Sequence, residues 1–242
     1  MKIKTFVLLF NPNIEDLTRW IELDVSLYCN TPVAVGRANY YGTSSNIGIA
    51  RALMEMSNIS KREGFEGFIF FDQDTVIDKK VMNQIKDNLN SSSVNSLIHF
   101  SGIYASSIDV NYVINSCTFF PNSLVEISVK EGLLNFFVDG VDLYISVIAR
   151  MHEYSIQRIY IGGINHVENQ DWIYFQILQR KFRIKNYSDD RVKELMTGHL
   201  RLLRKVVTMF LLKDIVYSLK LVFTISVWYV YRTFLLNFAK KI

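Results

Sequence analysis

The first half of the chain alternates short apolar runs with longer segments of helical pattern, and this order limits the possible folds more than any other feature. The apolar runs TFVLLF, VSLYC and FIFF are separated by residues 14–23 and 47–56, both of which have helical patterns. A strand, helix, strand, helix, strand succession joins parallel strands through helical crossovers. The sequence therefore predicts an α/β fold with a mostly parallel sheet flanked by helices.

Several further elements are expected along the chain. Residues 78–90 are predicted as a helix, and LIHFSGIYA and VNYVINSCTFF as strands. Residues 142–151 are predicted as a helix with Asp142 as its N-cap, followed by the short strands SIQRIYIGGI and KFRIKNY. The first apolar run ends at Asn11-Pro12 after six residues, which is short for a signal-peptide core, so we expect it to be the first strand.

Composition restricts the classes of protein. A chain of 242 residues with 50% hydrophobic content can bury one full core, and we expect a catalytic domain over 1–190 and an appendage over 191–242. The net charge of +4 favours anionic partners such as nucleotides or acidic lipids but is too small to indicate nucleic-acid binding. The two cysteines, Cys29 and Cys117, lack paired or zinc-binding spacing, which predicts no disulfide and fits a reduced compartment.

The appendage is basic, aromatic and apolar. Its longest uncharged run, LVFTISVWYVY, is shorter than the roughly 20 residues that a spanning helix needs. Its cations and aromatic side chains instead favour helices that lie on an anionic membrane surface. The alternative is a pair of helices packed on the domain or on another subunit.

Polar loops follow the predicted strands or precede a helix, at the edge where open α/β sheets bind ligands. The segment FIFFDQDT brings Asp72 and Asp74 to this edge directly after a buried strand. Two carboxylates at such a position can bind a divalent cation, and the cation can neutralise a diphosphate. The alternative is a turn with two solvated carboxylates.

Two later segments also carry candidate chemistry. The run FFVDGVD brings Asp139 and Asp142 to the start of a helix, where a carboxylate could deprotonate a hydroxyl group. A common Asp-Gly turn and an N-cap are the structural alternatives. His166 in GGINH could bind a metal through its imidazole, although a lone histidine is more often structural.

Together these segments resemble the bacterial rhamnosyltransferase-like branch of the family 2 glycosyltransferases. The resemblance covers most of residues 1–190 and implies the GT-A fold. It is carried by six segments in order: LFNP at 9–12, CNT at 29–31, NIGIARAL at 46–53, FFDQDT at 70–75, FVDGVD at 137–142 and NH at 165–166.

The resemblance implies roles for the site residues. Asp72 would help to hold the nucleotide, Asp74 would bind Mg²⁺ or Mn²⁺, and His166 would join the metal site. Asp142 would be the general base, with Asp139 as the second choice. The nucleoside would lie near three asparagines in the polar loops: Asn11, Asn30 and Asn46.

The implied function is inverting, metal-dependent transfer of a deoxysugar, such as L-rhamnose from dTDP-rhamnose, onto a polyprenyl-diphosphate-linked saccharide in O-antigen or capsular polysaccharide synthesis. The enzyme would be peripheral, on the cytoplasmic face of a bacterial inner membrane. One alternative is a UDP-hexose or galactofuranose donor. Another is an inactive relative that scaffolds polysaccharide assembly, because Cys29 and Tyr144 stand where the family usually carries acidic residues.

Overall fold

The computed structural model describes residues 1–31, 40–43, 45–103, 112–138, 140–166, 172–177, 180–185, 188–208, 215, 216, 219 and 226. The chain forms two compact units, Met1–Val167 and Glu168–Ile242. The predicted division into a catalytic domain over 1–190 and a tail over 191–242 stays a prediction.

The first unit contains a seven-stranded sheet in the order β3-β2-β1-β4-β7-β6-β8. Neighbouring strands are parallel except for β7, which runs antiparallel to both β4 and β6. The strands are β1 Ile3–Leu9, β2 Ser26–Cys29, β3 Tyr40–Gly42, β4 Gly67–Asp72, β6 Ser96–Ser101, β7 Thr118–Pro121 and β8 Ser155–Tyr160. The mostly parallel α/β sheet predicted from the sequence is confirmed, and it is consistent with the GT-A fold.

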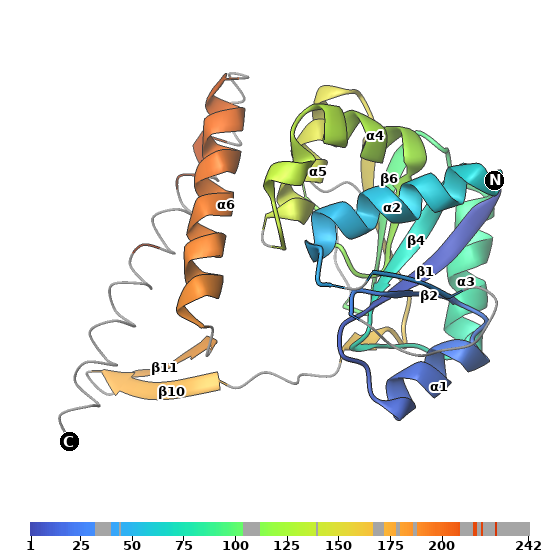
Figure 1. Ribbon diagram of the computed structural model, residues 1–242, viewed down its shortest axis with the longest axis horizontal. Coiled ribbons are helices and arrows are strands. Elements are labelled where there is room, and N and C mark those ends of the chain that lie inside the picture. Colours follow the sequence, from blue (N-terminus) through green and yellow to red (C-terminus); the bar gives the residue numbers. More distant parts are fainter. Residues whose placement is uncertain are drawn as a thin grey trace. The chain divides into compact units, whose positions relative to one another are not determined.

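Helices cover both faces of this sheet (Figure 1). They are α1 Ile14–Glu22, α2 Gly48–Arg62, α3 Lys79–Asn90, α4 Asn122–Lys130, α5 Val141–Met151 and the short 3-10 helix η1 Leu133–Asn135. Trp20 of α1 and Ile85 of α3 pack in one core with Val7 and Phe71 of the central strands. On the other face, α2 packs on β1 and β4 and on α4, and α4 packs on α5.

Strand β4 shows why the central strands are apolar throughout. Phe68, Ile69, Phe70 and Phe71 have no exposed surface, because successive side chains enter opposite faces and helices cover both. Phe68 stacks on Phe120 of β7 at a centroid distance of 5.7 Å. Burial of each such side chain contributes roughly 1.5–3 kcal/mol, so β4 is a firm support for the turn at its carboxyl end.

Most of the predicted elements are present, and some were missed. The βαβαβ order and the helix at 78–90 are confirmed by β1, α1, β2, α2, β4 and α3. The sequence patterns did not predict β3, which has only three residues, or helix α4. The prediction of Asp142 as the N-cap of α5 is wrong: the N-cap is Gly140, whose φ of 82° lies in the left-handed region that glycine favours.

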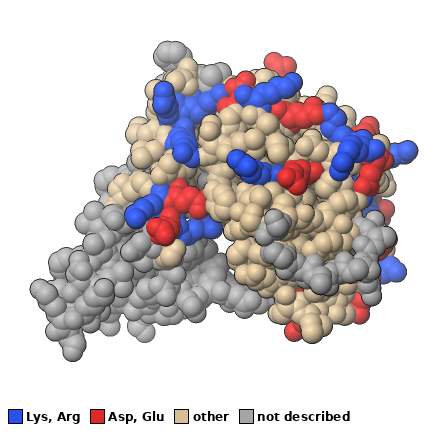
Figure 2. Space-filling view, in the orientation of Figure 1, with Lys and Arg blue, Asp and Glu red and all other residues tan. Residues whose placement is uncertain are grey.

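The surface of the first unit mixes charges of both signs. Figure 2 shows Lys and Arg side chains interspersed with Asp and Glu. Lys61 of α2 pairs with Glu126 of α4, and Lys4 of β1 pairs with Glu63. Cys29 and Cys117 are buried free thiols.

The second unit contains an antiparallel pair of strands and a long helix. Strand β10, Trp172–Ile177, pairs with β11, Arg180–Lys185, and α6 spans Asp189–Thr208. The later part of the predicted basic, apolar tail lies mostly outside the described residues. Among the helices that the structure describes, none is long and apolar enough to cross a membrane.

The sheet contains a buried histidine whose protonation would make the stability of the fold depend on pH. His99 of β6 is 4% exposed, and its Nδ1 lies 3.1 Å from Thr118 Oγ1 of β7. Burial, followed by the positive charge of Arg158 on the adjacent β8, lowers the pKa of His99 to about 4. The folded protein therefore holds this imidazole neutral at a pH where the unfolded chain would protonate it.

We predict that His99→Gln flattens the pH dependence of stability. The unfolded chain binds a proton at His99 near pH 6.5 and the folded chain near pH 4, so stability is lost as pH falls through this window. The loss in the wild type would be at most about 3 kcal/mol. Urea unfolding between pH 4.5 and 7.5 measures it, with the surface variant His152→Gln as control. An unchanged slope in His99→Gln would refute the prediction.

Candidate functional site

Three parallel strands end at the same edge of the sheet and bring predicted site residues to it. Register pairs Leu8 of β1 with Asp72 of β4, and Leu9 of β1 with Cys29 of β2. Asn11, just past β1, has a φ of 46°, and its N–H donates to Thr31 Oγ1 at 3.1 Å. The loops after β1 and β2 are therefore joined directly by a hydrogen bond.

Asn30 and Asn46 use their amide groups to order the loop that precedes α2. Asn30 is 3% exposed; its Nδ2 donates to Asn46 Oδ1 at 2.8 Å, and its Oδ1 accepts the Ile47 N–H at 2.9 Å. Asn46 Oδ1 also accepts the Gly48 N–H at 3.0 Å. The hydrogen bonds of these two amides therefore stabilise the conformation of the loop. Contact with a nucleoside stays a prediction for Asn11, Asn30 and Asn46.

Gly48 explains how two of the sequence motifs meet. Its φ is +77°, and a Cβ added there would lie 2.5 Å from the Phe137 carbonyl oxygen. The same carbonyl accepts the Ile49 N–H at 2.7 Å. The glycine thus permits close approach of the segment that leads to Asp142, which links the start of α2 to the start of α5.

Asp72 and Asp74 flank a tight turn between β4 and β5, a two-residue strand formed by Thr75–Val76. Desolvation raises the pKa of Asp72 to about 7, with a further rise from the neighbouring Asp74 charge. Asp142 also raises this pKa, and His166 lowers it. Four predicted site residues therefore lie within electrostatic range of one another.

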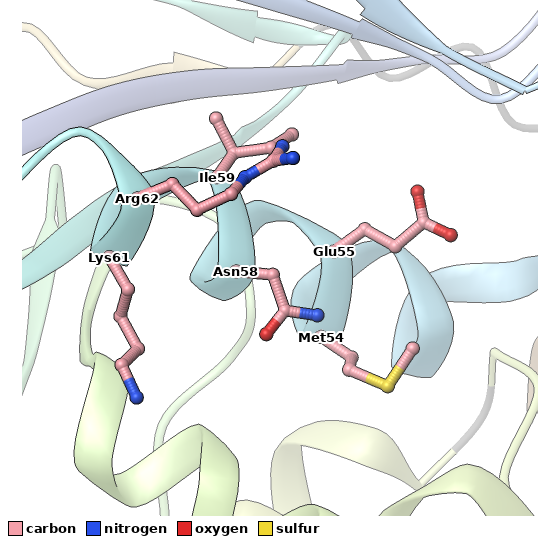
Figure 3. A pocket seen from close by; sticks show the side chains of 6 residues that line it. All are labelled: Met54, Glu55, Asn58, Ile59, Lys61 and Arg62. Carbon is pink, nitrogen blue, oxygen red and sulfur yellow. The ribbon is translucent and has the colours of Figure 1, made fainter.

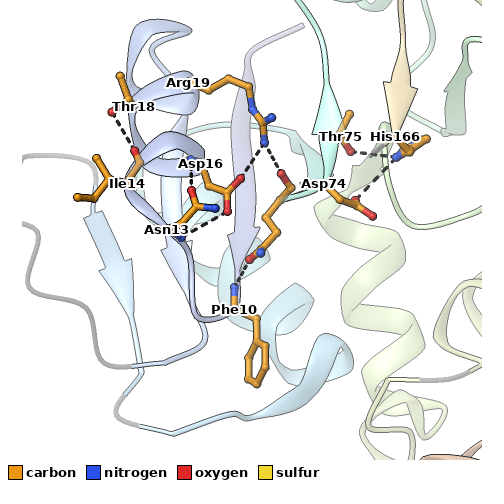
Figure 4. Close-up of polar contacts among 10 residues, drawn as sticks. Phe10, Asn13, Ile14, Asp16, Thr18, Arg19, Asp74, Thr75 and His166 are labelled. Carbon is orange, nitrogen blue, oxygen red and sulfur yellow. Dashed lines mark hydrogen bonds and ion pairs between the residues drawn. The ribbon is translucent and has the colours of Figure 1, made fainter. Parts of the chain in front are cut away.

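His166 reaches the turn through a short antiparallel pairing. It lies in β9, Asn165–His166, and pairs with Thr75 of β5. Its Nδ1 lies 3.8 Å from Asp74 Oδ1 and 3.4 Å from Thr75 Oγ1 (Figure 4). The Asp74 carboxylate beside it raises the pKa of His166, which favours the charged pair.

Two buried hydroxyl groups support this arrangement, and the sequence motifs indicated neither of them as a support. Ser116 Oγ accepts the Asp72 N–H at 3.2 Å and lies 2.7 Å from Thr75 Oγ1. A chain of contacts thus runs from the Asp72 backbone through Ser116 and Thr75 to His166. Nothing in the sequence signals Ser116, because it lies 41 residues from Thr75 and in no recognisable motif.

Asp142 lies in the first turn of α5, where its Oδ1 accepts the N–H of Leu143 at 2.8 Å. A carboxylate in the first turn of a helix is favoured by the helix dipole. Asp139, the second candidate for the general base, lies outside the described residues.

Cys29 and Tyr144, which stand where the sequence resemblance would lead one to expect acidic residues, both pack in the interior of the domain. Cys29 has no exposed surface and lies in the core cluster under α1 and α3. Tyr144 is 3% exposed; its hydroxyl donates to the Glu131 carbonyl, and its ring lies 4.7 Å from that of Phe136. Both side chains serve the core of the domain.

The carboxylate oxygens of Asp72 and Asp74 are the kind of ligand that a hard divalent cation prefers. Asp74 Oδ1 is buried and accepts no hydrogen bond, and the Asp72 carboxylate is destabilised by its acidic neighbour. Within the described ranges, no three His, Cys, Asp or Glu side chains come close enough together to hold a metal ion by themselves. Mg²⁺ is commonly held by one or two carboxylates together with substrate phosphates, and this donor set fits that mode.

Two open hollows lie elsewhere, on the surface of α2. One, of about 540 Å³, is lined by Met54, Glu55, Asn58, Ile59, Lys61 and Arg62 (Figure 3). The other, of about 310 Å³, lies between α2 and α4. None of the predicted site residues lines either hollow.

Comparison with known proteins gives only distant likeness. No family model matches the chain, and no curated protein matches it. The crystal structure of S. aureus TarS is similar with a TM-score of 0.47 and 13% identity over 84% of this chain and 40% of that one. The structure of S. aureus TarS 1–349 is similar with a TM-score of 0.41 and 14% identity, over 67% and 60%. The chain spans less than two thirds of either TarS chain, and the likeness does not identify an activity.

Proposed function

We propose that the chain is a metal-dependent, inverting glycosyltransferase with the GT-A fold. One observation carries the proposal: the pairing of β5 with β9 brings His166 against Asp74 at the end of β4. Asp142 lies close enough to this turn for its negative charge to raise the pKa of Asp72. Two carboxylates, an imidazole and a further carboxylate at the carboxyl edge of the sheet suit transfer from a diphosphate-linked donor.

Each residue has a defined task in this proposal. Asp72 and Asp74, with His166 in its neutral form, would hold Mg²⁺ or Mn²⁺ together with phosphate oxygens of the donor, because no three such side chains among the described residues lie close enough to hold a metal ion alone. Such a cation would neutralise the departing diphosphate. Asp142 would accept the proton of the acceptor hydroxyl as the oxygen attacks the anomeric carbon and the bond to the diphosphate breaks. A single displacement of this kind inverts the anomeric centre.

The donor and acceptor come from the sequence resemblance. We propose dTDP-L-rhamnose as the donor and a polyprenyl-diphosphate-linked saccharide as the acceptor, in O-antigen or capsular polysaccharide synthesis. A UDP-hexose or galactofuranose donor is the second candidate. Because Cys29 and Tyr144 pack in the core, these departures have a structural reason that does not require a loss of activity. An inactive relative that scaffolds polysaccharide assembly is the other alternative.

Because the proposed acceptor is linked to a membrane lipid, we also propose that the protein is peripheral on the cytoplasmic face of a bacterial inner membrane. Helix α6 supports it with an exposed stripe that contains Lys193, Leu200, Arg204 and Val207. Leu200 and Val207 are 48% and 46% exposed. Apolar and basic side chains on one helical face suit an anionic bilayer surface.

We predict that Asp142→Asn keeps donor binding and loses transfer by about 10²–10⁴-fold, because only the base is removed. Calorimetry with the donor measures binding, and product formation measures transfer. Asp87→Asn, on the exposed face of α3, is the control. Turnover near that of the wild type would show that Asp142 is not the base.

We predict that the double variant Leu200→Glu/Arg204→Glu weakens binding to vesicles that contain phosphatidylglycerol. The double variant replaces one apolar and one cationic side chain by carboxylates, which the anionic lipid headgroups repel. Lys86→Glu, at an exposed position of α3, makes the same kind of charge change on a different helix and is the control. Sedimentation with anionic and with neutral vesicles measures the effect, and equal sedimentation of the double variant and the wild type would contradict the interfacial role of α6.

A further inference from the structure

Gln73, the residue between the two aspartates, contacts two other elements at once. Arg19 of α1 donates through Nη2 to the Gln73 carbonyl oxygen at 2.5 Å. The Phe10 N–H, just past β1, donates to Gln73 Oε1 at 2.6 Å. Figure 4 labels Arg19 and Phe10, the two donors, together with Asp74 and His166. The turn is therefore held from the side of α1 and β1 as well as from the side of β9.

Arg19 is itself held in place by its own helix. Its Nη2 lies 3.3 Å from Asp16 Oδ1, and Asp16 closes a capping box with Asn13 at the start of α1. The guanidinium lies 5.7 Å from the ring centroid of Trp20, which is fully buried and packs on Phe71 of β4. Because the helix start and the aromatic core both restrain it, the guanidinium presents its donor in a defined direction.

The bond to Phe10 extends this restraint to the other strand-end loops. Phe10 is followed by Asn11, whose N–H donates to Thr31 past β2. The loops after β1, β2 and β4 thus form one connected set. In the proposed function, the loops after β1 and β2 face the nucleoside, and the turn after β4 faces the diphosphate.

We infer that Arg19 is a positioning residue, which fixes the Gln73 carbonyl and so directs Asp72 and Asp74 toward one diphosphate-bound cation. The inference rests on the proposed function. The two bonds to Gln73 restrain the backbone of the residue that joins the two aspartates. The Gln73 side chain then transmits the position of the turn to the nucleoside loops.

The restraint is testable without any ligand. In Arg19→Met the hydrogen-bond donors are lost while much of the apolar stem is kept. We expect backbone amides of residues 72–75 to exchange with solvent at least about tenfold faster than in the wild type, with Arg19→Lys in between. Thr18→Ala, whose hydroxyl donates to the Ile14 carbonyl of the same helix, is the matched control. Unchanged exchange in Arg19→Met would overturn the inference.

Nucleotide binding tests the consequence for the site. We expect Arg19→Met to reduce the Mn²⁺-dependent gain in affinity for dTDP or UDP by about tenfold, with partial rescue by Arg19→Lys. A purely structural role would lower the melting temperature without this selective loss. Arg19→Lys is the second variant if Arg19→Met does not fold. Gln73→Met removes the acceptor for Phe10 but keeps the carbonyl that Arg19 contacts, so it tests the link to the loop after β1.

The outcomes separate the two proposals. Full Mn²⁺-dependent affinity in folded Arg19→Met would overturn the positioning role of Arg19, and full affinity in folded Gln73→Met would overturn the link from the turn to the loop after β1. If the wild type binds neither nucleotide with Mn²⁺, the proposed function fails, and amide exchange still decides whether Arg19 holds the turn.

Discussion

The rest of the site depends on a costly arrangement: two carboxylates placed next to each other where a buried strand ends. Burial and the Asp74 charge together raise the pKa of Asp72 to about 7, so the protein destabilises its own charged group. The surroundings tolerate this because β4 is covered on both faces and Ser116 accepts the Asp72 N–H. A cation shared with a diphosphate would remove the repulsion.

Restraints from distant parts of the chain meet at this turn. Helix α1 contributes Arg19, the segment before β7 contributes Ser116, and β9 contributes His166. Each lies 41 residues or more from its partner in the turn, so the geometry exists only when the whole first unit is folded. The start of α5, with Asp142, joins through the contact of Phe137 with Gly48. Rigid support of this kind lets a site be precise although it is built on loops.

The sequence predicted the sheet because local patterns determine it. Apolar runs such as FIFF are long enough to show that both faces of β4 are buried, and the helical spacing between them implies crossovers. It could not predict the antiparallel β7, because strand direction depends on the path of the chain. The N-cap of α5 was assigned to Asp142 because Asp is a good cap, whereas Gly140 takes the position through its left-handed backbone.

The candidate site shows the same division. Asp72, Asp74 and His166 were predicted, and the structure places them within one turn and its paired strand. Arg19 and Ser116 carry no signal in the sequence, and Thr75 lies in a motif that gives it no role, since the importance of all three comes from contacts across 41 residues or more. Motifs identify residues that meet a ligand, and only the fold identifies those that hold the motifs in place.

The most direct measurement is calorimetric titration of the intact protein with dTDP-rhamnose, UDP-glucose and UDP-galactofuranose, each with Mn²⁺ and with a chelator. If the turn after β4 is a cation and diphosphate site, at least one donor binds, binding depends on Mn²⁺, and Asp74→Asn removes that dependence. Binding that is equal with and without Mn²⁺, or that persists with full Mn²⁺ dependence in folded Asp74→Asn, would contradict this account.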